Sequence, residues 1–162
     1  MTREQSLLRR IRVCLSVFMA GLVFSGVTAL PLPWELRVLS SMMGTWAPAG
    51  LRHWLDFVRQ GLDATGAQYP FMAYGTDWLA FGHFVIAIAF VGPYRDPVRN
   101  QWVIQFGLIA CALVVPYALL FGLLRGIPFF WRLIDCSFGL LGLIPLWLCR
   151  RDTGELAQLQ QN

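Results

Sequence analysis

The chain has 162 residues, of which 57% are hydrophobic and 14% are charged, and its formal net charge is +4. Soluble domains carry a charge at about a quarter of their positions, so this composition excludes an ordinary water-soluble protein and favours a membrane protein. The arginines lie beside apolar runs, where they set membrane orientation, so the positive charge does not indicate a nucleic-acid interface.

The first predicted spanning helix is the uncharged run from Val13 to Leu30, which is long enough to cross a bilayer. The basic residues that precede it are Arg3, Arg9, Arg10 and Arg12. A cleavable signal peptide has the same basic start, and Val27-Thr28-Ala29 resembles a cleavage site. We favour an uncleaved anchor, because the apolar run exceeds the usual length of a signal core.

An extracytoplasmic segment of residues 31–74 is expected after this span. Its apolar side chains recur at helical spacing at Leu51, Trp54, Leu55, Val58 and Leu62. We therefore predict an amphipathic helix there, preceded by a shorter helix from Pro33 to about Met43. The amphipathic helix is expected to lie on the outer membrane surface, and the alternative is a lid over the helical bundle.

Three more spans are predicted at residues 75–92, 101–124 and 129–149. The short connection from Arg125 to Pro128 would make the last two spans an antiparallel hairpin. The predicted fold class is an all-α integral membrane protein, a four-helix bundle of two antiparallel hairpins with an outer amphipathic interfacial helix. Residues 1–162 are expected to form one membrane domain.

Arginine placement predicts the orientation, because cytoplasmic loops are enriched in basic residues. Besides the amino-terminal arginines, the basic residues on the same side of the predicted bundle are Arg95, Arg99, Arg150 and Arg151. We expect both termini in the cytoplasm and a multi-pass protein of the plasma membrane, which is the inner membrane in a Gram-negative bacterium. The hydrophilic tail of residues 152–162 is expected to be a short helix or disordered.

His83 and Asp135 are the main candidates for a functional site, because ionisable side chains inside a membrane are costly. At about 1.5 Å per residue, each lies roughly 10 Å from the outer end of its span. If their spans are neighbours, an imidazole and a carboxylate meet at similar depth. These two residues are therefore the candidate catalytic pair.

A purely structural role for the same residues is the competing interpretation. Arg132 stands three residues before Asp135, close enough on a helix for the two to pair. Likewise, His83 can simply bond a neighbouring carbonyl. His53, Tyr74 and Asp77 would extend a ligand-binding cluster at the outer face, although Asp77 also suits a helix cap.

No metal or cofactor site is predicted. The side chains suited to copper or to haem iron are those of His53, His83, Met42, Met43 and Met72. No two of them have the spacing of a metal-binding motif. The four cysteines are expected to be buried thiols rather than zinc ligands or disulfides, because they form no C-x-x-C pair.

The function expected from these observations is that of a non-catalytic accessory or assembly partner of a larger membrane system. Its expected partners are the lipid bilayer and another membrane protein or a second copy, and changes at Trp54 and Leu55 are expected to weaken such binding. The alternative is a membrane-embedded enzyme or a cofactor- or lipid-binding protein that uses His83 and Asp135. A channel or transporter would require oligomerisation.

Overall fold

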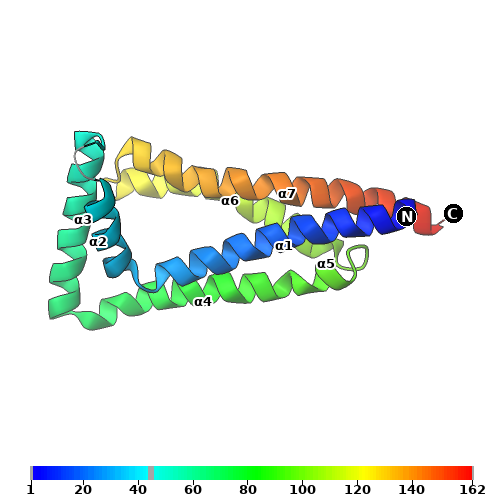
Figure 1. Cartoon of the computed structure of the whole chain (residues 1–162), viewed down its shortest axis with the longest axis horizontal. Coiled ribbons are helices and arrows are strands. Elements are labelled where there is room, and N and C mark those ends of the chain that lie inside the picture. The colour runs from blue at the N-terminus through cyan, green and yellow to red at the C-terminus, as the bar shows by residue number, and fades with distance from the viewer. Residues whose placement is uncertain (1, 44–45, 162) are drawn as a thin grey trace. The chain divides into compact units, whose positions relative to one another are not determined.

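The computed structural model describes residues 2–43 and 46–161, which are almost entirely helical (Figure 1). The elements in chain order are α1 (Arg3–Ala29), α2 (Leu32–Met43), α3 (Ala49–Gln68), the 3-10 helix η1 (Pro70–Ala73), α4 (Tyr74–Ala89), α5 (Val91–Arg95), α6 (Gln101–Leu124) and α7 (Phe129–Gln161). No strand occurs in the described residues. The prediction of an all-α chain is thus confirmed.

Within these residues, four helical segments are long and apolar enough to cross a membrane, namely α1, Pro70–Arg95, α6 and α7. Their number and order match the predicted spans. Two helices are longer than predicted, because α1 begins at Arg3 rather than near Val13 and α7 continues past Cys149 to Gln161. The hydrophilic tail is therefore a direct extension of the last helix.

The chain forms two compact units, one of residues 22–85 and one of residues 1–21 and 86–162. The boundaries between the units fall inside α1 and inside α4. The polar candidates are consequently divided, with His83 in the first unit and Asp135 in the second.

In the second unit, α6 and α7 pack so closely that an added Cβ at some glycines would meet atoms of the facing helix. A Cβ atom at Gly139 would lie 2.5 Å from the carbonyl oxygen of Cys111, and one at Gly107 would lie 2.8 Å from Leu146 Cδ1. Such spacing is typical of membrane helices, where small residues let two backbones approach. Close steric fit is therefore one of the contributions to packing between these two helices.

The connection from α6 to α7 is a glycine-dependent helix end. Gly126 has φ +69°, and its amide donates to the Leu123 carbonyl at 3.1 Å. The Ile127 amide donates to the Gly122 carbonyl at 2.8 Å, which completes a Schellman motif. A residue with a Cβ would be strained at Gly126, so this position fixes where α6 ends.

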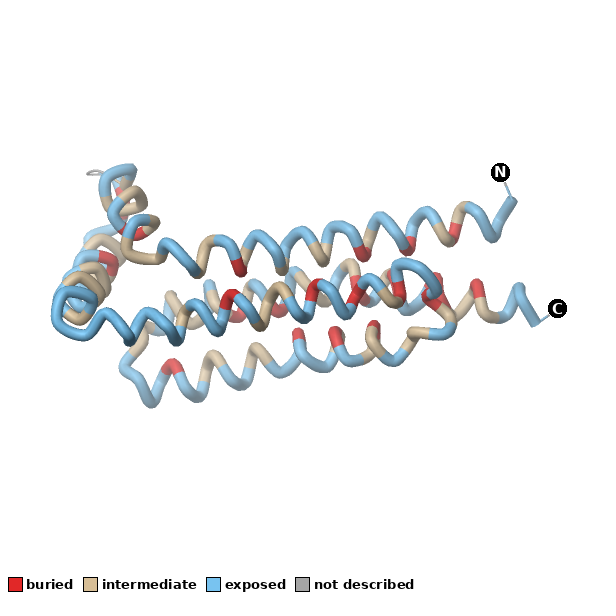
Figure 2. Tube along the Cα trace, turned by 90° about the horizontal axis from the view of Figure 1, so that it is seen from below, coloured by how far each residue is buried: buried red, intermediate tan, exposed pale blue. Residues whose placement is uncertain are grey.

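The start of α1 lies beside the end of α7, and both carry buried aliphatic side chains. Leu7, Ile11 and Leu15 are each no more than 1% exposed, and Leu156 in the extension of α7 is fully buried. Farther along α1, the Phe18 and Phe90 rings lie 4.8 Å apart. Figure 2 shows the buried positions distributed along the helices, with exposed and intermediate positions between them.

In the unit of residues 22–85, α2 packs on α3 and the end of α1 packs on α4. Leu36 and Leu55 are buried in the α2–α3 layer, and both segments that were predicted to be helical are helices. A Cβ atom at Gly26 would lie 2.6 Å from Phe84 Cε1, so α1 and α4 also approach closely.

Candidate functional site

His83 lies on α4, and both of its ring nitrogens have partners inside the protein. Nδ1 lies 2.8 Å from the Leu79 carbonyl oxygen, and Nε2 lies 3.3 Å from Ser25 Oγ on α1. A carbonyl oxygen only accepts, so Nδ1 carries the proton in the neutral ring and the Ser25 hydroxyl donates to Nε2. His83 therefore links α4 to α1.

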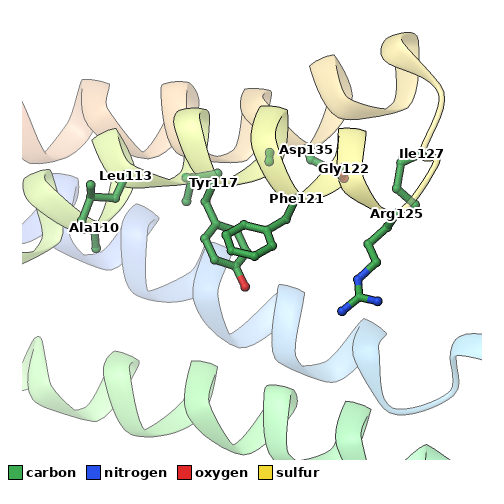
Figure 3. Close-up of a pocket in the computed structure, with 10 residues that line it drawn as sticks. Ala110, Leu113, Tyr117, Phe121, Gly122, Arg125, Ile127 and Asp135 are labelled. Atoms are coloured by element: carbon green, nitrogen blue, oxygen red, sulfur yellow. The ribbon is translucent and has the colours of Figure 1, made fainter.

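Asp135 projects from α7 into an apolar groove along α6. The groove has a volume of about 560 Å³ and is lined mainly by α6 side chains such as Tyr117 and Phe121, with Arg125 at its end (Figure 3). The Asp135 side chain is half-buried, and no side chain of the described residues forms an ion pair or hydrogen bond with it.

The expected pair between Arg132 and Asp135 is not formed, because Arg132 turns toward α6. Its Nη1 donates to the Leu119 carbonyl at 3.2 Å, and its guanidinium lies 5.3 Å from the centre of the Phe129 ring. The aliphatic part of Arg132 fills the space beside Gly122, where an added Cβ would lie 2.5 Å from it. Packing against a glycine and bonding a carbonyl replace the ion pair.

The remaining polar candidates belong to the unit of residues 22–85 and are not joined to one another. His53 is exposed on α3, Asp77 is exposed in the first turn of α4, and the Tyr74 ring lies 5.8 Å edge-on from Trp78. No hydrogen bond or ion pair connects His53, Tyr74 and Asp77 in the part of the chain that is described. In place of a cap, the neighbouring Thr76 hydroxyl donates to the Ala73 carbonyl at 2.7 Å.

The side chains that could bind a metal ion are likewise not brought together in the described residues. Among residues 2–43 and 46–161, no three His, Cys, Asp or Glu side chains come together in a way that could hold a metal ion. Three of the four cysteines are buried and Cys14 is half-buried, all as free thiols.

Sequence reasoning missed the polar cluster that joins the two ends of the chain. Asp152 is 1% exposed, and its Oδ2 lies 3.2 Å from Arg10 Nε on α1. The geometry of this contact is too oblique for a hydrogen bond, so the attraction is ionic. Arg151 reaches Asp152 Oδ1 at 3.2 Å, and Arg3 pairs with Glu155 at 2.6 Å.

This cluster places the start of α1 beside the end of α7 within one unit, so both termini lie at the same end of that unit (Figure 1). The signal in the sequence was the spacing of Leu7, Ile11 and Leu15, which marks an apolar face that begins ahead of the predicted span and continues into it.

No protein-family model, curated protein or solved structure gives a significant match to this chain.

Proposed function

We propose that the protein is a multi-pass protein of the cell membrane, built from two antiparallel hairpins, with both termini in the cytoplasm and the α2–α3 layer outside. Four apolar helical segments support the membrane placement, and the arginines near the termini and in the turn after α5 support the orientation. The contact between the start of α1 and the end of α7 supports placing both termini on one side.

Within the membrane, the protein acts as a non-catalytic accessory or assembly partner of a larger system. The observation that carries this proposal is the set of large aromatic side chains left uncovered on the α2–α3 layer. Trp34 is 63% exposed, Trp46 is 76% exposed and Phe57 is 63% exposed. Aromatic side chains are the residues that most often dominate the energy of protein interfaces.

Trp54 and Leu55, which the sequence predicted to take part in partner binding, are poorly exposed on this layer. Leu55 is 2% exposed and Trp54 is half-buried, so both belong to the packing within the unit rather than to its surface. A binding test therefore belongs on Trp46 and Phe57, which a partner can reach.

The experiment is purification of the full-length tagged protein from its native membrane in mild detergent, with an inventory of the proteins that accompany it. Replacing Trp46 and Phe57 with Ala is expected to release a stoichiometric partner. The matched control is Phe138→Ala, which removes an aromatic side chain that is 64% exposed on α7. Equal partner loss in the control, or none in the Trp46 and Phe57 variant, contradicts the proposed surface.

The polar candidates give a second test of the same proposal. Both ring nitrogens of His83 bond within the protein, to Ser25 and Leu79, so a structural role is enough to explain this residue. Under the accessory proposal, a His83→Gln and Asp135→Asn double variant keeps its partner. If the double variant folds but loses its partner, His83 and Asp135 contribute to partner binding.

A second candidate function is binding of a lipophilic ligand, and the groove that holds Asp135 favours it. The groove is mostly apolar, but it presents a carboxylate from Asp135 and a guanidinium from Arg125. A small apolar site with a few polar groups is the usual form of a ligand pocket. An absorption spectrum and a lipid extract of the purified protein test this, because a stoichiometric pigment or lipid that is lost in Asp135→Asn supports it.

A further inference from the structure

The amino-terminal arginines of α1 do not all have the same surroundings. Arg3 and Arg10 pair with Glu155 and Asp152. Arg9 and Arg12 instead line a separate groove of about 560 Å³ between α1 and the α5 residue Tyr94. No acidic side chain lines this groove, so the positive charge of Arg9 and Arg12 is not compensated there.

The groove is polar at one end and aliphatic at the other. Arg9 and Arg12 lie toward the start of α1, and Ser16 follows one turn later, while Val13 and Val17 continue into the apolar run. From Arg9 to Val17 the helix rises about 12 Å. That distance matches the passage from a lipid headgroup to the upper part of its acyl chains.

Tyr94 gives the polar end a defined wall. The Arg12 guanidinium lies 5.8 Å from the centre of the Tyr94 ring, which holds it beside α5. A planar guanidinium held in this way is well suited to a phosphodiester, because it can donate two parallel hydrogen bonds. Arg9 stands one helical turn earlier on the same face and adds a second positive charge.

We propose that the groove between α1 and Tyr94 binds one anionic glycerophospholipid of the leaflet in which the chain termini lie. The phosphate lies between Arg9 and Arg12, and an acyl chain follows Val13 and Val17. Charge complementarity selects an anionic headgroup, and the aliphatic half of the groove selects a lipid over free phosphate. This inference rests on the proposed membrane placement.

The experiment reconstitutes the full-length protein in nanodiscs of phosphatidylcholine containing a minor fraction of phosphatidylglycerol, and measures by native mass spectrometry which lipid is retained. Wild type is expected to retain phosphatidylglycerol. An Arg9→Gln and Arg12→Gln double variant is expected to lose about tenfold or more of that preference, because each basic residue near the surface contributes to anionic-lipid binding.

The matched control is an Arg99→Gln and Arg150→Gln double variant, which removes the same charge from exposed positions outside the groove. It is expected to keep the preference. Equal loss in the control shows only a general charge effect and overturns the site, and so does an unchanged Arg9 and Arg12 variant. A protein that needs no detergent or bilayer to stay soluble would refute the membrane placement instead, so the two failures are distinguishable.

A second variant keeps the test decisive if the Arg9 and Arg12 variant does not fold. Val13→Trp fills the aliphatic half of the groove from a position that is 55% exposed and leaves both arginines in place. It is expected to lower phosphatidylglycerol retention, whereas a purely electrostatic attraction to the leaflet would leave retention unchanged and overturn the proposal. Inorganic phosphate at millimolar concentration is expected not to displace the lipid, and displacement would contradict the lipid as occupant.

Discussion

Replacing Gly139 with Ala is expected to loosen the packing of α7 against α6. The new Cβ would lie 2.5 Å from the Cys111 carbonyl oxygen and 2.9 Å from Val114 Cβ. Neither atom belongs to the far end of a flexible side chain, so α7 must move away by roughly 0.5–1 Å to restore ordinary contact at about 3.5 Å. A gap of that size forfeits a quarter to a half of the attraction of each neighbouring contact, which gives a loss of about 2 kcal/mol.

Gly21→Ala is the control for this prediction. An added Cβ at Gly21, also in a helix long enough to span a membrane, meets no atom within 4 Å. Both substitutions gain helix propensity of up to about 1 kcal/mol, so the difference between them isolates the steric effect. Unfolding of each purified variant by dodecyl sulfate in mixed micelles, followed by tryptophan fluorescence, measures that difference. If Gly139→Ala is as stable as Gly21→Ala, the close approach of α6 and α7 does not limit this position.

Three further predictions concern the polar contacts and the topology. Asp152→Asn is expected to cost about 1–2 kcal/mol in the same unfolding assay, because it removes the buried negative charge that Arg10 and Arg151 contact, whereas Glu155→Gln at an exposed pair costs under about 1 kcal/mol; equal costs would contradict a special role for the buried carboxylate. Ser25→Ala is expected to cost about 1 kcal/mol through the lost interhelical bond, and Thr28→Ala, whose hydroxyl bonds its own helix, less than that. A single cysteine at Gln160, in a cysteine-free background, is expected to react with an impermeant maleimide only from the cytoplasmic side, and labelling from outside would refute the proposed orientation.

The spans could be predicted from the sequence because their signal is local. An uncharged run such as that of α6 needs no knowledge of its neighbours, and the predicted bounds of residues 101–124 coincide with those of the helix. The extensions of α1 and α7 could not be predicted in the same way. Each carries many polar residues, and the ion pairs between them join distant parts of the sequence, which local patterns do not reveal.

The polar candidates show the same division between local and distant information. The bond from His83 to the Leu79 carbonyl lies within one helical turn and was anticipated. Its bond to Ser25 depends on which helices are adjacent, and the helical periodicity of a sequence does not predict which helices are neighbours. The three-residue spacing of Arg132 and Asp135 favoured an ion pair between them. Arg132 instead packs beside Gly122 and bonds a carbonyl of α6, and neither contact could be predicted from spacing along α7.

The joining of the two chain ends also has a consequence for biosynthesis. Leu7, Ile11 and Leu15 leave the ribosome well before Leu156, which shares their unit. Until Leu156 is synthesised, the stripe on α1 therefore lacks this cover. A product that stops short of Asp152 would keep an exposed apolar face on α1 and an Arg10 without its partner. Cellular proteases degrade incompletely folded chains of this kind.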